Sequence, residues 1–265
     1  MRIMSYNTLF GGYDGADDRR AQLQIEIIRN AAPDILLLQE LKAFLDDGAK
    51  RLFEYERALG MRALVAVAPV TGQNTAVLIR PGIEVLSFTS DSAHFHHVAA
   101  IATLSVPGLP EPLTAISVHL CPNGTPVRLQ ETSYLFGYAA PEGYAVIGGD
   151  FNSLAPGDDE PADLGRLPAH FRTRYVNGEG KMDRRPIASL LQAGFIDLGA
   201  QHGDRRRTVP GAGFPASEFV DFRSDYLLAS APLSKRTSAF STVESAAAGE
   251  ASDHYPIYAD LEVAT

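Results

Sequence analysis

Residues 144–153 read YAVIGGDFNS, a short apolar run followed by two glycines and then by Asp150, Asn152 and Ser153. The run from Tyr144 to Gly148 has the length and composition of a buried strand. Asp150 and Asn152 are two residues apart, so an extended backbone would point both side chains the same way. The stretch therefore predicts a strand that presents polar side chains at its carboxyl end.

Polar side chains occur at the ends of several other apolar runs along the chain. Each of them alone is more often a cap or a turn residue than a catalyst, so the inference depends on the whole set. The further members are Asn7, Glu40, His119, Asp225 and the adjacent pair Asp253 and His254.

The remaining sequence alternates short β-branched runs with segments of helical periodicity. Strands are predicted at residues 2–6, 35–39, 63–68, 75–79, 83–88, 99–106, 113–119, 144–148, 224–228, 239–243 and 255–262. Helices are predicted at about residues 18–31, 43–59, 125–138 and 187–193. Residues 154–185 are rich in Pro, Gly and Asp and show little periodicity, which is typical of a functional or mobile loop. This pattern predicts one α/β domain over residues 1–265, with two packed sheets and helices outside them.

Composition limits the classes of protein that fit. Of 265 residues, 45% are hydrophobic and 21% charged, which excludes a disordered or collagen-like chain. The formal net charge of −9 argues against a protein that coats nucleic acid, because such a protein needs a basic surface. A nuclease that contacts a few phosphates and carries an acidic metal site is still compatible with this charge.

Cys121 is the single cysteine, so no intramolecular disulfide can form. The first residues contain no apolar segment of signal-peptide length, and no apolar run is long enough to span a bilayer. We therefore expect a soluble, cytoplasmic monomer that inserts no segment into a membrane.

The set of polar residues suggests a metal site. It offers carboxylate, amide and imidazole groups and no thiolate, which favours Mg²⁺ or Mn²⁺ over zinc. His254 needs a partner that fixes its tautomer, and Asp225 is the natural candidate. Asp253 and His254 would face apart in an extended backbone, so serving one site requires divided roles or irregular backbone.

Six segments, in order, carry a resemblance to a known family. The chain resembles the endonuclease/exonuclease/phosphatase superfamily, which includes deoxyribonuclease I, neutral sphingomyelinases and inositol polyphosphate 5-phosphatases. The matching segments span nearly the whole chain, and together they are far more specific than any one of them. They are residues 4–7 (MSYN), 33–40 (PDILLLQE), 117–120 (SVHL), 148–153 (GGDFNS), 224–228 (SDYLL) and 252–257 (SDHYPI).

The resemblance implies a four-layer α/β/β/α sandwich with the site at one edge of the two sheets. It also implies that Glu40 is the principal metal ligand, with Asn7 and Asp253 near the metal. Asp150 would orient or deprotonate the attacking water. The metal would stabilise charge on the phosphoryl group or the leaving oxygen during in-line attack.

The resemblance further implies phosphate contacts from Asn152, His119 and His254, with Asp225 as the partner of His254. Two departures from the abasic-site endonucleases matter. Those enzymes carry an acidic residue two positions after the asparagine of the first strand and a tyrosine in place of His119. Both departures point to the deoxyribonuclease I-like, sphingomyelinase-like and phosphatase branches.

The sequence thus predicts a divalent-metal-dependent phosphoesterase, with a small anionic metabolite or nucleotide as the favoured substrate. A deoxyribonuclease I-like endonuclease that cleaves DNA or RNA is the alternative. A non-catalytic scaffold of the same fold is least favoured, because none of the eight site residues is missing. Arginines in two loops are predicted to contact the anionic substrate, although ordinary solvated loops would also explain them. These arginines are Arg184, Arg185, Arg205, Arg206 and Arg207.

Overall fold

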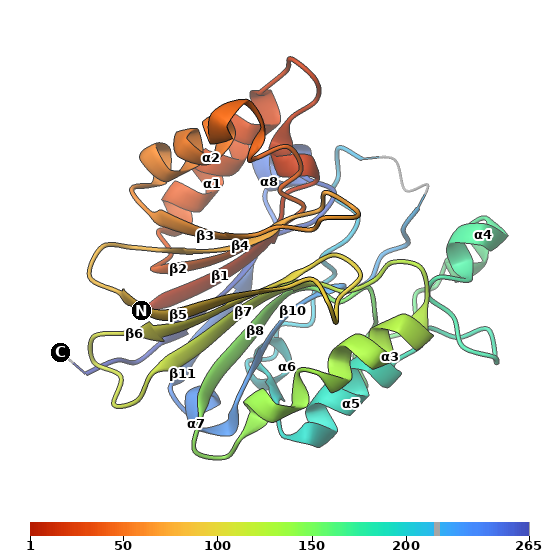
Figure 1. The fold of residues 1–265 in the computed structure, drawn as a ribbon. Coiled ribbons are helices and arrows are strands. Elements are labelled where there is room, and N and C mark those ends of the chain that lie inside the picture. Colours follow the sequence, from red (N-terminus) through yellow and green to blue (C-terminus); the bar gives the residue numbers. More distant parts are fainter. Residues whose placement is uncertain (215–217, 265) are drawn as a thin grey trace.

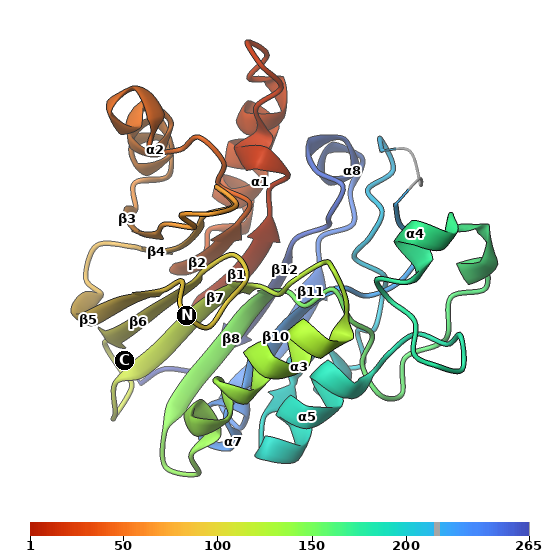
Figure 2. The same cartoon turned by 45° about the vertical axis from the view of Figure 1, so that its right-hand side comes forward.

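Two six-stranded mixed sheets pack face to face, and helices cover both outer faces (Figures 1 and 2). This computed structural model describes residues 1–214 and 218–264. The architecture is the four-layer sandwich that the sequence predicts. Residues between the sheets form one apolar core, and each sheet forms another with its own helices.

The first sheet pairs β1 and β2 in parallel and its other neighbours antiparallel. Successive side chains of a strand point to opposite faces. Ile35 and Leu37 therefore face the second sheet, while Leu36 and Leu38 pack against the helices. In spatial order the strands are β11 (Thr237–Thr242), β12 (Ile257–Leu261), β1 (Arg2–Asn7), β2 (Ile35–Gln39), β4 (Thr75–Ile79) and β3 (Arg62–Ala66).

The second sheet has the parallel pair β7 and β8 at its centre. Its register places His119 opposite Asp150 on one side and Asp225 opposite Asp150 on the other. Three polar residues from distant parts of the sequence thus lie side by side. In spatial order the strands are β5 (Glu84–Asp91), β6 (Ala99–Ser105), β7 (Leu113–His119), β8 (Tyr144–Asp150), β10 (Asp225–Ala229) and β9 (Ile196–Asp197).

On the first sheet lie α1 (Arg19–Ala31), α2 (Asp46–Leu59) and α8 (Ala246–Ala251), and on the second lie α3 (Thr125–Ser133) and α5 (Arg185–Ala193). The sequence did not predict α8. Apolar side chains form the buried face of α5 and part of that of α1 and α2, whereas α3 buries Thr125, Arg128, Glu131 and Thr132. Shorter elements that the sequence did not predict are η1 (Phe10–Gly12), η2 (Phe136–Ala139), η3 (Leu164–Arg166), α4 (Ala169–Arg172), α6 (Leu198–Gln201) and α7 (Ala231–Ser234).

Two helix predictions extend too far. The helix expected over residues 125–138 ends at Ser133, because the N–H groups of Tyr134 and Leu135 bond to carbonyls only three residues back. This tighter pattern ends the α-helix. The helix expected over residues 43–59 begins at Asp46, and left-handed backbone at Asp47, Gly48 and Ala49 delays its regular part.

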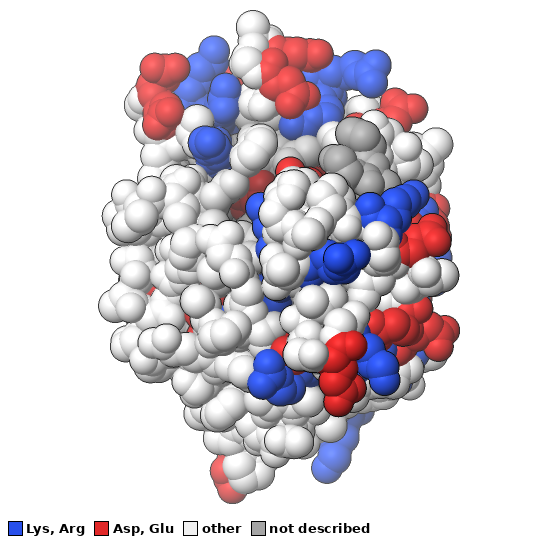
Figure 3. Space-filling model, turned by 90° about the vertical axis from the view of Figure 1, so that its right-hand side faces the viewer, with Lys and Arg blue, Asp and Glu red and all other residues white. Residues whose placement is uncertain are grey.

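The segment expected to be an aperiodic loop, residues 154–185, contains no strand but is packed. Its apolar side chains, including Leu164 and Tyr175, form a fourth cluster with Val209, Val220 and Phe222. On the face drawn in Figure 3, basic side chains are interspersed with acidic ones and form no continuous track. Within residues 1–214 and 218–264, no helix has the length and apolar character needed to cross a membrane.

Candidate active site

The predicted polar residues meet at one edge of the sandwich, on the side away from the N-terminus (Figure 1). The strands of both sheets end there, and their terminal side chains surround a cavity of about 380 Å³. Asn7 and Asp225 are buried behind its wall, 0% and 3% exposed. The predicted residues that line the cavity itself are Glu40, His119, Asp150, Asn152, Asp253 and His254.

Irregular backbone shapes this edge. Asn152 has a φ of 48° and is left-handed, so the extended backbone expected between Asp150 and Asn152 is wrong. The Asn152 backbone N–H instead turns back to Asp150 Oδ1 at 2.9 Å, a turn that asparagine tolerates well. Glu40 is also left-handed, with a φ of 60°. Such conformations cluster at functional sites.

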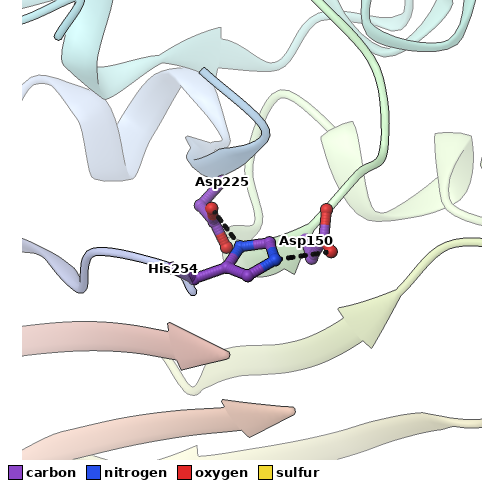
Figure 4. A group of neighbouring side chains, drawn as sticks. All are labelled: Asp150, Asp225 and His254. Carbon is purple, nitrogen blue, oxygen red and sulfur yellow. Dashed lines mark hydrogen bonds and ion pairs between the residues drawn. The ribbon is translucent and has the colours of Figure 1, made fainter. Parts of the chain in front are cut away.

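Asp225, His254 and Asp150 form a buried relay (Figure 4). Asp225 Oδ2 lies 2.8 Å from His254 Nδ1, and Asp150 Oδ2 lies 3.6 Å from His254 Nε2. Burial alone lowers the pKa of His254, but Asp225 and Asp150 outweigh it and raise that pKa well above its usual value. His254 is therefore held as an imidazolium whose two N–H groups face two carboxylates.

The two oxygens of Asp150 have different partners, and Oδ2 accepts from Asn7 Nδ2 at 3.3 Å. Its Oδ1 accepts from the Ser224 hydroxyl at 2.6 Å and from the Asn152 backbone. Its Oδ2 faces His254 and, at 3.4 Å, His119 Nε2. Burial lowers the pKa of His119, so this imidazole is neutral near pH 7. One oxygen of Asp150 is thus structural, while the other is the atom that faces the imidazoles.

Glu40 and Asp253 crowd negative charge into the same cavity. Burial raises the pKa of Glu40, and burial with repulsion from Glu40 raises the pKa of Asp253 to about 6. Asn7 Nδ2 donates to Glu40 Oε1 at 3.1 Å, and Gln73 Nε2 lies 3.4 Å from Glu40 Oε2. Buried carboxylates held close together need a cation, and hard oxygen donors fit Mg²⁺ or Mn²⁺.

A second geometry for an ion lies in the relay. One atom each of Asp150, Asp225 and His254 lie within 4.8 Å of one another, close enough to surround a metal. The short Asp225–His254 bond already occupies His254 Nδ1, however. We therefore regard that bond as the orienting pair, with Glu40 and Asp253 as the better metal ligands.

Several residues of the cavity wall carry no signal that sequence reasoning recognised. Gln73, His97 and Phe219 line the cavity, and so does Phe10, which follows Asn7 by three residues. Three histidines within residues 94–97 (HFHH) were the available signal for His97. Arg174 also lines the cavity and belongs to a basic segment, but its position there depends on tertiary packing.

Two buried residues of α3 hold the loops of this wall. The Glu131 carboxylate accepts from the backbone N–H groups of His96 and Cys121, both at 2.8 Å. Arg128, fully buried, donates to the carbonyls of Cys121 at 2.8 Å and Arg174 at 2.7 Å. The two side chains thus connect three loops that carry cavity residues.

The five predicted arginines lie elsewhere in the described part of the chain, and none of them lines this cavity. Each pairs with at least one acidic side chain instead, although Arg205 shares Asp158 with Arg223. The pairs are Arg184 with Glu160, Arg185 with Asp183, Arg205 with Asp158, Arg206 with Asp204, and Arg207 with Asp221 and Glu244. Their charges are therefore largely balanced where they stand.

Comparison with known proteins gives the same picture. The model of the Endonuclease/Exonuclease/phosphatase family matches residues 4–254. No curated protein matches the chain by sequence.

Solved structures share the fold across nearly their full lengths. An AP endonuclease from Archaeoglobus fulgidus aligns with a TM-score of 0.70 and 21% identity, covering 99% of this chain and 100% of that one. A mannosyl-6-phosphatase from Bacteroides thetaiotaomicron gives 0.68 and 13%, covering 99% of each chain. A 3′ phosphatase from Neisseria, bound to a DNA hairpin, gives 0.67 and 21%, covering 99% of each. At these identities the likeness concerns the fold alone.

Proposed function

Because the chain belongs to the endonuclease/exonuclease/phosphatase family, whose members are hydrolytic enzymes acting on phosphate esters, we propose that it is a phosphoesterase that requires Mg²⁺ or Mn²⁺. The observation that supports this most directly is the cavity in which Glu40 and Asp253 lie beside the Asp150–His254–Asp225 relay. It combines carboxylates for a cation with a charged imidazole for an anionic phosphoryl group.

Glu40 and Asp253 are the ligands that would hold the ion, with Asn7 orienting Glu40 through its amide. A divalent ion bound there would supply electrostatic stabilisation of the charge on the phosphoryl group or on the leaving oxygen. Gln73 supports the second oxygen of Glu40, so both oxygens have defined positions before a ligand arrives.

Asp150 is the residue we assign to the attacking water. Ser224 and the Asn152 backbone hold one of its oxygens, which leaves Oδ2 to orient the water or accept its proton. His254, kept charged by Asp225, donates from Nε2 to a phosphoryl oxygen, and His119 and Asn152 provide further contacts. Water then attacks in line with the leaving oxygen, so that a new P–O bond forms as the bond to the leaving oxygen breaks. The proton of the water passes to Asp150, and the leaving oxygen takes a proton from solvent and departs as an alcohol.

A small anionic ester is the substrate that we favour. The cavity, at about 380 Å³, is within the range of small-molecule sites, roughly 300–1,000 Å³. Net charge is −9, and the arginines of the two loops pair with acids rather than forming a basic track. A long duplex would gain from such a track, because phosphate contacts dominate nucleic-acid affinity. The alternative substrate is DNA or RNA, since Arg174 could contact a phosphate beside the scissile one.

A kinetic comparison tests this proposal. Turnover of small phosphate esters and of plasmid DNA is measured with Mg²⁺ or with excess EDTA, each at two salt concentrations. We expect metal-dependent hydrolysis of a small ester with little salt sensitivity. Rapid, strongly salt-sensitive cleavage of plasmid DNA, with negligible activity on small esters, would instead establish a nuclease. Full activity in EDTA would refute the metal requirement.

A further inference from the structure

We propose that Phe10 forms the platform of a subsite for a planar aromatic group, so that the substrate is a small nucleotide whose base stacks on this ring. The inference rests on the proposed function, because it concerns the part of the substrate that lies beside the scissile phosphate. Phe10 lines the catalytic cavity and is 38% exposed, so part of its ring is accessible to a ligand.

The backbone at Phe10 is strained. Leu9, Phe10, Gly11 and Gly12 are four consecutive left-handed residues, with φ of 45°, 59°, 67° and 76°. Glycine is required at the last two positions, since a Cβ there would lie 2.1 Å from the Phe44 ring or 2.6 Å from Ala21 backbone. A non-glycine residue in this conformation costs about 1–2 kcal/mol.

Glycine would adopt the left-handed conformation at position 10 without strain, but the residue there is phenylalanine. Burial raises the pKa of Glu40, and a hydrogen bond from the Phe10 backbone N–H opposes that rise. A backbone N–H directed at Glu40 does not require a phenylalanine side chain, because glycine would donate equally well. Because the Phe10 ring is partly exposed, it gains only part of the hydrophobic stabilisation that full burial would provide. A bulky ring at such a position is explained by a ligand that covers it.

The cavity also presents a second aromatic ring. Phe219 lines the cavity, and its ring lies edge-on to the His254 imidazole with centroids 5.6 Å apart. Leu9, next to Phe10, donates its backbone N–H to Asn7 Oδ1 at 3.2 Å. Both rings are therefore tied to residues of the catalytic centre. A planar group stacked on Phe10 would be joined to the scissile phosphate by a short linker such as ribose.

Two basic side chains lie near the proposed subsite. The Lys42 ammonium lies 5.0 Å from the centre of the Phe10 ring, and Arg174 lines the cavity, where its guanidinium pairs with Glu218 at 3.2 Å. The cavity volume, about 380 Å³, is that of a site for one small ligand. A free mononucleotide is therefore the source of the planar group that we favour over a base in a nucleic-acid strand.

Binding can be measured by tryptophan fluorescence rather than by activity, because the chain contains no tryptophan. Phe10→Trp introduces a single fluorophore at the subsite, and Phe53→Trp places one on the exposed face of α2, where Phe53 is 59% exposed, as the matched control. We expect adenosine monophosphate to quench the fluorescence of Phe10→Trp saturably, with no quenching by glycerol phosphate or inorganic phosphate. Equal quenching of both variants, or none in Phe10→Trp, would overturn the proposal.

Steady-state kinetics provide a second, independent test of the subsite. A stacked base contributes about 1–3 kcal/mol, so Phe10→Ala should raise KM for a nucleotide substrate roughly 5- to 150-fold. KM for glycerol phosphate should change less than about 2-fold, since that ester has no ring to stack. Equal losses on both esters would refute the subsite while leaving the phosphoesterase assignment intact. Saturable quenching by single-stranded oligonucleotides alone would overturn the choice of a free nucleotide.

Discussion

Replacing Asp225 by asparagine tests the buried relay at the residue that orients His254. The substitution keeps the shape of the side chain and removes its charge from a position 2.8 Å from His254 Nδ1. With an effective dielectric constant of about 20, that contact corresponds to an attraction of about 6 kcal/mol. Desolvation of the two groups offsets part of this energy.

The expected result is a large loss of rate. Asp225 is the largest of the charges that raise the pKa of His254, so Asp225→Asn should lower that pKa and leave a smaller fraction of the imidazole protonated. We expect kcat/KM to fall by about 10²- to 10⁴-fold, the upper figure being the loss seen for the equivalent change in serine proteases. We expect the wild type to lose activity as pH rises through the raised pKa of His254, and in Asp225→Asn this loss should begin at lower pH.

The assay is kcat/KM against pH on a small phosphate ester, with NMR titration of the imidazole and thermal unfolding on the same samples. Asp221→Asn is the matched control, because the Asp221 side chain is 69% exposed and lies outside the relay. A folded Asp225→Asn variant with activity within about threefold of wild type would refute the reasoning, since a charge pair worth several kcal/mol cannot be removed without effect.

Three further predictions concern the other buried carboxyl groups. Glu40→Gln should weaken Mg²⁺ binding at least tenfold by calorimetry, whereas the exposed Glu26→Gln should bind Mg²⁺ as wild type does. In the wild type, Mg²⁺ affinity should fall as pH drops below about 6, where Asp253 becomes protonated, and a pH-independent affinity would contradict its role as a ligand. Burial raises the pKa of Glu131 to about 7 from an ordinary 4.5. The wild type should therefore lose about 3 kcal/mol of unfolding free energy between pH 4.5 and pH 7, because the folded state binds a proton that the unfolded state has released. Denaturant titrations of Glu131→Gln should not show this loss.

The sequence predicted the fold and the members of the site because both depend on local patterns. Strands such as Ile35–Gln39 are buried throughout and mostly apolar, and the polar residue that follows such a strand lies where the strand leaves the sheet. Parallel pairing of β7 with β8 then brings His119 opposite Asp150 without further information. The adjacent Asp253 and His254 both line the cavity, since the backbone before β12 is irregular.

The rest of the site depends on long-range packing that no local pattern contains. His97, Gln73 and Arg174 reach the cavity only because α3 holds their neighbouring loops or because Glu40 binds them. The left-handed backbone of Asn152 follows from its turn against Asp150. Arginine clusters are visible in the sequence, but the acids that engage them are distant in it, as with Arg205 and Asp158.

The most direct test of the central claim is the fate of the oxygen of water. The enzyme hydrolyses p-nitrophenyl phosphate, or its bis ester, in ¹⁸O-labelled water, and mass spectrometry locates the label. Attack by a water on phosphorus, prepared by Asp150 in a metal-dependent site, predicts one ¹⁸O in the phosphate product per turnover and none in p-nitrophenol. The labelling should occur with Mg²⁺ and stop with EDTA or in Asp150→Asn. Label in p-nitrophenol, or undiminished hydrolysis in EDTA, would contradict the account.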